Sequence, residues 1–437
     1  MSNAAKIVVL DDDPTGTQTV HGVPVLTEWS IPSLVAELTA GGSCFYILTN
    51  SRAFTAPRAC AINQEIGRNL LSAGKQCGRS FQVVSRSDST LRGHYPAETD
   101  ALAEALGGKF DATLIIPAFF DGGRVTMDDI HYVAGPGGLT PAGETEFARD
   151  ATFGYRSSNL RDWVEEKTVG RVRASDVVSF SLADIRGEPA PLTAKLASLS
   201  GGVVAIVNLA EAADLHAFTR ALRDAQAQGK KFLFRTAASF VASHAGISPR
   251  PLLTAAEIAP PGVGRGLVVV GSHVGKTSLQ LQNLLESKRV SGVEIKVEKL
   301  LIPSTRGAEV ARAAQRVESL LDQGANVALF TSRALVTGSN AAENLAIGET
   351  VSRSLVEIVS SLRNRPRWLV AKGGITSSDV ATAALGVRRA LILGQALAGV
   401  PVWQLGPETR WPGLAYVVFP GNVGGPDALA QLVAMLG

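Results

Sequence analysis

The sequence predicts an α/β protein of two domains, each built around a mostly parallel sheet flanked by helices. Short apolar runs rich in Val and Ile, such as KIVVL (6–10) and LVVVGS (267–272), alternate with segments of helical period almost throughout the chain. Continuous apolar strands separated by helices are typical of parallel sheets covered on both faces. The length of 437 residues favours two cores, because single cores stop growing near about 250–300 residues.

The first half contains a series of expected strands and two clear helices. The strands are KIVVL (6–10), CFYILTN (44–50), FQVVS (81–85), ATLIIPA (112–118), VVAIVNL (203–209) and KFLFRT (231–236). Apolar residues at helical spacing predict helices over residues 56–74 and 98–107. These elements form a first domain, residues 1–245.

The second half repeats the same alternation after a break. Residues 246–266 are rich in Pro and Gly, which end helices and strands, and we expect a linker there. Helices are expected over 316–324 and 343–362, within a second domain of residues 267–437. Its expected strands are LVVVGS (267–272), NVALFTS (326–332), WLVAKGG (368–374), RALIL (389–393) and AYVVFPG (415–421).

Composition and charge narrow the class of protein. The formal net charge is only +3 and no Lys/Arg run is present, so neither nucleic acid nor a membrane is expected as a partner. The three cysteines lack zinc-ligand spacing, and we expect reduced thiols. The start of the chain lacks a signal-peptide pattern, and no apolar stretch approaches the roughly 20 residues of a membrane helix. We therefore expect a soluble cytoplasmic protein that binds small molecules; a homo-oligomer is left open.

Polar loops follow the strands of the first half. In open parallel sheets, ligands bind where the strands end at their carboxyl side. Here those loops read DDDPTGTQT, TNSRAF, SRSDSTLRG and PAFFDGGRVT, and they combine arginines, aspartates and hydroxyl side chains. Arginine suits a carboxylate or phosphate and aspartate suits hydroxyl groups, so a sugar acid would satisfy both. The alternative is that these residues only form ion pairs and turn caps among themselves.

Glycine-rich loops follow the strands of the second half. GSHVGKTS (271–278) is not a P-loop, because Gly271 and Gly275 enclose three residues where that motif needs four. A glycine turn between a strand and a helix still presents backbone N–H groups that favour an anion. KGGITSSD and PGNVGGPD repeat this design. Three such loops in one domain indicate a cradle for nucleotide phosphates.

These motifs together resemble the four-carbon acid sugar kinase family. DDDPTGT, TNSR, SDSTLRG (87–93) and PAFFDGGRVTMDDIHYVAG are similar to its substrate-side motifs, and VVVGS, KGGIT and PGNVGGPDAL to its ATP-side motifs. The resemblance runs nearly end to end. It implies bacterial carbohydrate metabolism, an acid-sugar-binding first domain, an ATP-binding second domain and an active site in the cleft between them.

The resemblance and the composition of the loops together indicate which residues act. Asp13 and Asp88 are the candidates for the catalytic base. The substrate would contact Asp12, Asp13, Arg52, Arg86, Ser87, Asp88, Ser89, Arg92 and Arg124. ATP would contact Ser272, Gly373, Gly374, Ile375, Thr376, Gly421 and Asn422.

The expected reaction is direct in-line transfer of a phosphoryl group from ATP to a hydroxyl of a small sugar acid, four-carbon or a related oxo or branched acid. Arg86 and Arg92 are expected to clamp the carboxylate, while Mg²⁺ bridges phosphate oxygens. No residue is assigned as a metal ligand. A non-catalytic sensor of sugar acid and nucleotide is the alternative. A dehydrogenase is disfavoured, because no GxGxxG follows a strand.

Overall fold

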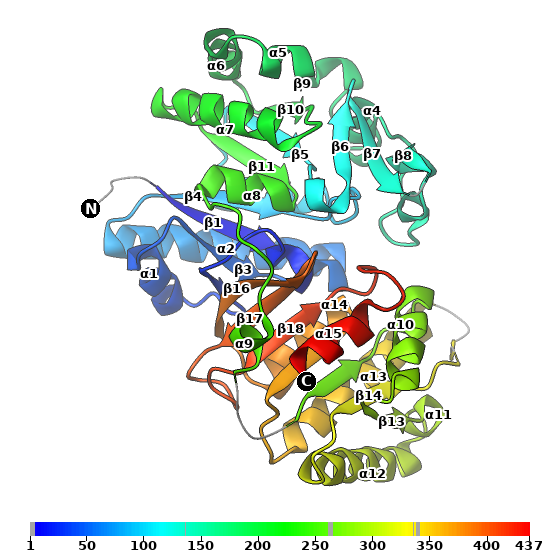
Figure 1. Cartoon of the computed structure of the whole chain (residues 1–437). Coiled ribbons are helices and arrows are strands. Elements are labelled where there is room, and N and C mark those ends of the chain that lie inside the picture. The colour runs from blue at the N-terminus through cyan, green and yellow to red at the C-terminus, as the bar shows by residue number, and fades with distance from the viewer. Residues whose placement is uncertain (1–4, 136, 261–264, 335, 338–340) are drawn as a thin grey trace. The chain divides into compact units, whose positions relative to one another are not determined.

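The protein folds into two compact units that divide between Pro249 and Arg250. The structure is a computed structural model, and it describes residues 5–135, 137–260, 265–334, 336–337 and 341–437. Figure 1 shows the elements of each unit.

The first unit is built on a parallel sheet in which every neighbouring pair of strands runs in the same direction. All six residues of its central strand β1 are buried, which explains why the run from Ile7 to Leu10 is apolar. In sheet order the strands are β2 (Val23–Leu26), β3 (Cys44–Leu48), β1 (Lys6–Asp11), β4 (Phe81–Arg86), β11 (Phe232–Thr236), β5 (Ala112–Ile116), β10 (Val203–Val207) and β9 (Val178–Phe180).

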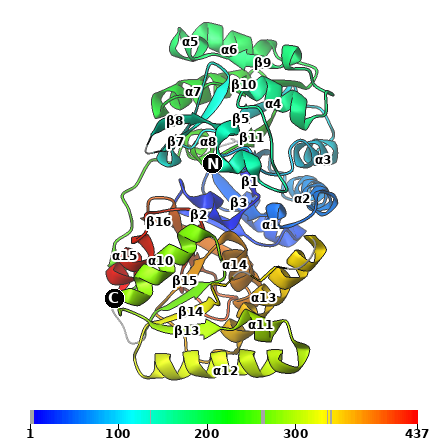
Figure 2. The same cartoon turned by 90° about the vertical axis from the view of Figure 1, so that its right-hand side faces the viewer.

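Helices cover both faces of this sheet. The alternation along β11 shows the two faces: Leu233 packs in the cluster that α1, α2 and α3 form with the sheet, whereas Phe234 lies 5.2 Å from the ring of Phe240 in α8. Figure 2 shows α1, α2 and α3 together beside β1 and β3. The helices are α1 (Ile31–Thr39), α2 (Ala56–Cys77), α3 (Ala97–Ala105), α4 (Leu160–Lys167), α5 (Leu182–Arg186), α6 (Pro189–Ser198), α7 (Ala212–Ala227) and α8 (Ala238–Ala245).

A small antiparallel sheet interrupts the α/β alternation between β5 and α4. It consists of β6 (Arg124–Met127), β7 (Ile130–Gly135) and β8 (Gly138–Pro141). This sheet brings Arg124 and His131 to the unit, and it was not predicted. Its strands are short, polar and mostly half-exposed, so the hydrophobic pattern there is weak.

The second unit has a mixed sheet. The strands β13, β14, β12, β15 and β18 are parallel, and β17 joins β18 and β16 in antiparallel pairing. In sheet order the strands are β13 (Ser291–Ile295), β14 (Val327–Thr331), β12 (Leu267–Val270), β15 (Trp368–Lys372), β18 (Ala415–Phe419), β17 (Val400–Leu405) and β16 (Arg389–Leu397).

Helices again lie on both faces. Figure 2 shows α10 and α15 on one side of this sheet and α13 on the other. The core on the α10 and α15 side includes Val268, Val370, Leu284 and Leu432. The helices are α9 (Ala255–Ile258), α10 (Gly275–Glu286), α11 (Val297–Leu300), α12 (Pro303–Asp322), α13 (Ala341–Ser361), α14 (Gly374–Asp379) and α15 (Ala428–Leu436).

The α/β prediction is confirmed, and every expected strand is present. The strands that the sequence did not reveal include β2, β9, β13 and β17. β2 and β9 are short, β13 is a partly exposed edge strand, and β17 pairs in antiparallel fashion. Part of the segment expected as a linker has a structural role: Leu253 and Ile258 are buried in the core of the second unit. Residues 261–264 of that segment lie outside the described residues.

In each unit, later strands of the chain lie on both sides of a central strand, so the order of the strands reverses there. In the first unit β3 and β4 flank β1, and in the second unit β14 and β15 flank β12. Such reversal points are where parallel sheets bind ligands, at the carboxyl ends of the strands. No helix among the described residues has the length and apolar character needed to cross a membrane.

Candidate functional site

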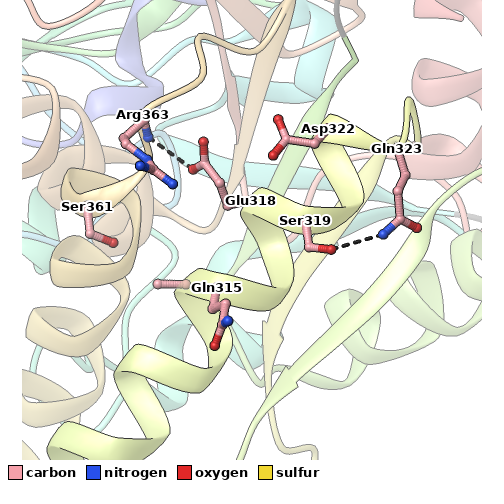
Figure 3. Close-up of a pocket in the computed structure, with 8 residues that line it drawn as sticks. Gln315, Glu318, Ser319, Asp322, Gln323, Ser361 and Arg363 are labelled. Atoms are coloured by element: carbon pink, nitrogen blue, oxygen red, sulfur yellow. Dashed lines mark hydrogen bonds between the residues drawn. The ribbon is translucent and has the colours of Figure 1, made fainter.

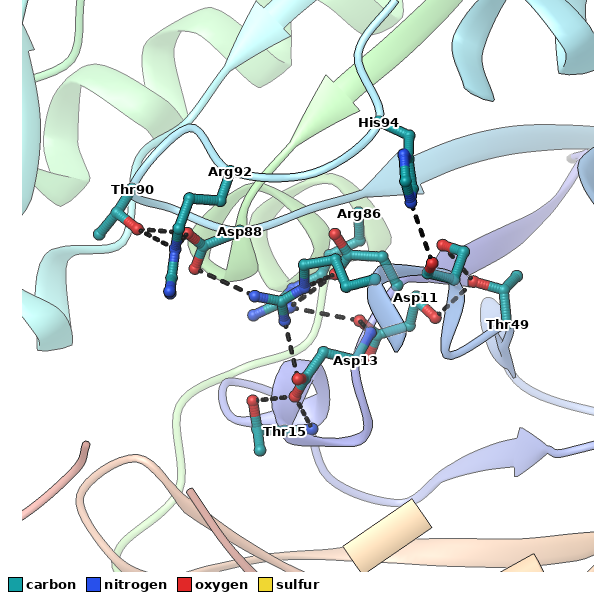
Figure 4. Close-up of polar contacts among 12 residues, drawn as sticks. Asp11, Asp13, Thr15, Thr49, Arg86, Asp88, Thr90, Arg92 and His94 are labelled. Carbon is teal, nitrogen blue, oxygen red and sulfur yellow. Dashed lines mark hydrogen bonds and ion pairs between the residues drawn. The ribbon is translucent and has the colours of Figure 1, made fainter. Parts of the chain in front are cut away.

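A cluster of charged side chains lies at the carboxyl ends of β1, β3 and β4 in the first unit, and Arg52 is at its centre. The Arg52 Nε is 3.2 Å from Asp12 Oδ1, one terminal nitrogen is 3.0 Å from Asp13 Oδ2, and the other is 3.5 Å from Asp88 Oδ1. One guanidinium group therefore joins the loops that follow β1, β3 and β4. Figure 4 shows Asp11, Asp13, Arg86, Asp88 and Arg92 gathered in this region. We call Asp11, Asp12, Asp13, Arg52, Arg86, Asp88 and Arg92 the acid–arginine cluster.

The deepest part of this cluster is a buried ion pair. Arg86 lies 3.2 Å from Asp11 and 3.9 Å from Asp12, and each of the three side chains is less than 5% exposed. Burial raises the pKa of Asp11 to about 7 and that of Asp12 to about 8, although Arg86 and Arg52 act in the opposite direction. For these two carboxylates, the free-energy cost of removing the charged form from water exceeds its stabilisation by the arginines.

In Asp13 and Asp88 the nearby arginines outweigh the effect of burial on the pKa. Burial acts to raise the pKa of Asp13, but Arg52 and two hydrogen bonds from Thr15 hold it below its ordinary value. Asp88 is likewise held below its ordinary pKa, despite burial, by Arg92 and Arg52. Both side chains are partly exposed, 20% for Asp13 and 14% for Asp88. They are thus ionised carboxylates that a ligand can reach.

The loop from Ser87 to Gly93 is held by side chains from distant parts of the unit. His131 Nε2 lies 2.7 Å from the carbonyl oxygen of Ser89, and the Tyr155 hydroxyl donates to the carbonyl of Thr90 at 2.8 Å. Arg235 donates to the carbonyls of Leu91 and Arg92. Leu91 has a φ of 69°, a left-handed conformation that is costly for leucine and persists only in a fixed loop.

Two further arginines line the more open side of the cluster. Arg92 donates from Nε to Asp88 Oδ2 at 2.9 Å and lies 3.6 Å from Asp150. Arg92 and Arg124 both pack over the ring of Phe147, at 5.1 and 5.9 Å from its centroid. Arg124 donates to a neutral partner, the carbonyl of Gly122. These two guanidinium groups are placed for an anion.

The three glycine loops of the second unit converge. A methyl group added at Gly373, where φ is +112°, would lie 2.9 Å from Ser272 Cβ, and one added at Gly271 would lie 2.3 Å from Thr376 Oγ1. One added at Gly421 would lie 3.5 Å from Ser272 Oγ. The loops after β12, β15 and β18 therefore touch one another, and their glycines permit that approach.

Cationic side chains surround these loops. Lys276 donates to the carbonyl of Asn422 at 3.1 Å, and Arg333 donates to the carbonyl of Ser272 at 2.8 Å. Lys372, which is fully buried, donates to the carbonyls of Pro420 and Gly421. Thr277 ties the same loop to α10 through the carbonyl of Gly421 at 3.0 Å.

The structure brings the predicted residues together as two groups, one in each unit. Asp12, Asp13, Arg52, Arg86, Asp88 and Arg92 form the acid–arginine cluster, with Arg124 linked to it through Phe147. Ser87 and Ser89 are buried and act through their backbone. In the second unit Ser272, Gly373, Thr376 and Gly421 meet. Ile375 is 59% exposed beside them, Gly374 begins α14, and Asn422 accepts from Lys276.

Sequence reasoning missed several residues that build these sites. Arg235 is at the end of a predicted strand and His131 was given no role. Lys372 was visible only as the first residue of KGGIT. A buried charge within an apolar run was the available signal for Arg235 and Lys372.

Besides these two groups, a metal site or a pocket on the second unit could bind a ligand. Among the described residues, no group of three or more His, Cys, Asp or Glu side chains is arranged to hold a metal ion. A pocket of about 460 Å³ lies elsewhere on the second unit (Figure 3). It contains none of the predicted residues, and its lining is Ala314, Gln315, Glu318, Ser319, Asp322, Gln323, Ser361 and Arg363.

Comparison with known proteins agrees with this division. Residues 7–244 match the family model of a sugar-binding N-terminal domain, and residues 267–429 match that of a nucleotide-binding C-terminal domain. A protein of Heliobacterium modesticaldum named D-erythronate kinase is 27% identical over 340 residues, which cover 74% of this chain and 69% of the relative.

Solved structures share the fold. A Haemophilus influenzae protein from a family of unknown function is 19% identical with a TM-score of 0.65, covering 98% of this chain and 100% of its own. A Salmonella typhimurium LT2 protein described as a candidate tRNA synthase is 20% identical with a TM-score of 0.68, covering 98% of both chains. At this identity they show the fold alone. On the two family models, this chain belongs to the family that joins a sugar-binding N-terminal domain to a nucleotide-binding C-terminal domain, the four-carbon acid sugar kinase family.

Proposed function

We propose that the protein is an ATP-dependent kinase that transfers a phosphoryl group to a hydroxyl of a small sugar acid, with a four-carbon acid such as erythronate as the first candidate. The observation that carries this proposal is the acid–arginine cluster at the reversal point of a sugar-binding domain. The name of the Heliobacterium relative supports the substrate class.

The cluster offers both kinds of group that a sugar acid needs. Asp13 and Asp88 are ionised and partly exposed, so they accept hydrogen bonds from substrate hydroxyls. Arg92 and Arg124 lie on the open side beside Phe147 and would bind the carboxylate. Arg86 is 4% exposed and paired with Asp11, so in this proposal it supports the cluster and leaves the clamp to Arg92 and Arg124.

Asp13 is our choice for the group that orients the attacking hydroxyl and accepts its proton. Its carboxylate is fixed by Thr15 on one oxygen and by Arg52 on the other, and it is more exposed than Asp12 or Asp88. In phosphoryl transfer most of the catalysis comes from such positioning and from stabilising charge. Asp88 takes the supporting role of holding Arg52 and Arg92.

The nucleotide would occupy the converging glycine loops of the second unit. Backbone N–H groups after β12, β15 and β18 suit phosphates, and the close approach of Gly271, Gly373 and Gly421 to neighbouring loops makes a compact cradle. Mg²⁺, when bound with the nucleotide, would neutralise part of the phosphate charge.

The test is ADP release with Mg²⁺ and ATP against a panel of tetronates, 3-oxo-tetronates and branched oxo acids. We expect turnover with at least one acid and none with the matching neutral sugar alcohol, which lacks the carboxylate. ATP and acid binding without turnover across the panel would contradict the kinase proposal and favour a nucleotide-gated sensor of the acid.

A further inference from the structure

Three cations gather around the glycine loops of the second unit with uncharged partners. Lys276 donates to a backbone carbonyl, Arg333 to the carbonyls of Thr331 and Ser272 and to the Thr331 hydroxyl, and Lys372 to two carbonyls. This contrasts with the first unit, where Arg52, Arg86 and Arg92 each face an aspartate. Buried charges are normally balanced by an opposite charge. Lys276 is exposed and Arg333 is half-buried, so this applies to the buried Lys372, whose balancing anion we expect to be a ligand.

Lys372 is the most deeply placed of the three. It is 0% exposed, and its Nζ lies 4.2 Å from the centroid of the Phe419 ring. Its ammonium group contacts the carbonyls of Pro420 and Gly421, in the loop after β18. The residue that follows it is Gly373, which approaches Ser272. Lys372 therefore links the loops after β15 and β18 at the point where the loop after β12 meets them.

We propose that Lys372 is a positioning residue of the nucleotide site, whose ammonium group holds the loop after β18 and whose charge is balanced by the phosphates of the bound nucleotide. This inference rests on the proposed binding of a nucleotide by the second unit. It adds a residue and a form of regulation that the kinase reaction alone does not require, namely coupling of nucleotide binding to protonation.

The coupling follows from the surroundings of the amine. Burial, and then the charge of Lys276, lower the pKa of Lys372 to about 7. An anion beside it favours the charged form, so the nucleotide-bound protein holds a proton that the free protein has partly lost above pH 7. Affinity therefore falls as the pH rises above about 7, by at most about tenfold per pH unit for one proton.

The other titratable groups on the surrounding elements are few. His273 lies on the loop after β12, and Arg333 follows β14. Tyr416 of β18 donates to the carbonyl of Ser377, and Asp379 of α14 accepts from Ser352. Because His273 is on the loop after β12, the experiment includes a His273→Gln variant as a control.

The test is calorimetric binding of ADP between pH 6 and 8.5 to the wild-type protein and to K372M, K372R, K276M and H273Q. We expect K372M to bind about 10- to 100-fold more weakly at pH 6.5, as for loss of a charge-assisted contact. We expect K372M and K372R to lose the wild-type pH dependence, since neither titrates, while H273Q keeps it. K276M should move it to higher pH, because the charge of Lys276 helps to lower the pKa of Lys372. The titration of ADP itself is common to all and cancels in the comparison.

The result that overturns the inference is a pH dependence in K372R and K372M equal to that of the wild-type protein. If K372M does not fold by circular dichroism, K372R decides, since it keeps a charge at the site. If ADP binds with the expected proton linkage but no acid is phosphorylated, this inference stands and the kinase proposal fails. If the wild-type protein binds neither ADP nor ATP, both fail.

Discussion

Asp12 shows how much of this site depends on single residues. Its two carboxylate oxygens are buried without a hydrogen-bond partner among the described residues, and its near neighbours are Arg52 and Arg86. The three consecutive aspartates divide by exposure: Asp11 and Asp12 are buried with raised pKa values, and Asp13 is partly exposed with a lowered one. A ligand that donates a hydrogen bond to Asp12 would stabilise its charged form.

The raised pKa of Asp12 predicts a pH-dependent effect of Asp12→Asn on stability. Between about pH 4, its unfolded pKa, and about pH 8, its folded pKa, the folded protein holds a proton that the unfolded chain has lost. The wild-type free energy of unfolding therefore loses a contribution from Asp12 as pH rises, and Asn lacks this titration. The free energy of unfolding of Asp12→Asn minus that of the wild-type protein, measured by urea unfolding, should therefore rise from pH 5 to pH 8. A difference that stays flat over this range would contradict the raised pKa of Asp12.

Asp13→Asn tests the proposed base. The amide keeps the size of the side chain but cannot accept a proton, so kcat should fall by about 10²- to 10⁴-fold, with the circular dichroism spectrum unchanged. Asp224→Asn, on the exposed surface of α7, is the matched control and should keep wild-type kcat. A kcat for Asp13→Asn within about threefold of wild type, a range too small for loss of a general base, would assign the base to another residue.

At the scale of elements, loops take their shape from side chains that lie far away in the sequence. The loop 87–93 is held by His131 of β7, by Tyr155 and by Arg235 of β11. Because the carboxyl ends of parallel strands lie at one edge of a sheet, the sequence was enough to predict that Asp13, Arg52 and Asp88 share that edge. It could not predict these supports, because their role depends on which carbonyl each side chain reaches once the unit is folded.

Gly373→Ala tests whether the converging glycine loops bind the nucleotide. The added methyl would lie 2.9 Å from Ser272 Cβ, at a φ of +112° that costs a non-glycine residue about 1–3 kcal/mol. We expect ADP affinity to fall by at least about tenfold, which corresponds to about 1.4 kcal/mol, while binding of the acid by the first unit is retained. Gly275→Ala is the control, because a methyl there meets open space. Equal loss of affinity in both variants would argue against a role for the Gly373 turn.

At the scale of the whole molecule, the sequence predicted the α/β class because apolar runs of four to six residues, such as LVVV in β12, recur between helical segments. It did not predict β6–β8 or the antiparallel pairing of β16, β17 and β18. Strand direction depends on connections, and a run such as VPVWQL reads alike in either direction. Lys372 was missed for a related reason: whether a lysine at a strand end is exposed or buried is decided by the packing of α10 and the loop after β18.

The chain joins a sugar-binding domain to a nucleotide-binding domain, so the most direct test is whether it transfers phosphate from ATP to a sugar acid. The measurement is ³¹P NMR of a reaction containing the protein, ATP, Mg²⁺ and erythronate. We predict a new phosphomonoester signal that grows in equal amount with ADP, because direct transfer places each γ-phosphoryl group on one hydroxyl. If ADP appears with inorganic phosphate alone, or no phosphomonoester forms with erythronate or with any related acid, the account of this protein as a sugar-acid kinase is contradicted.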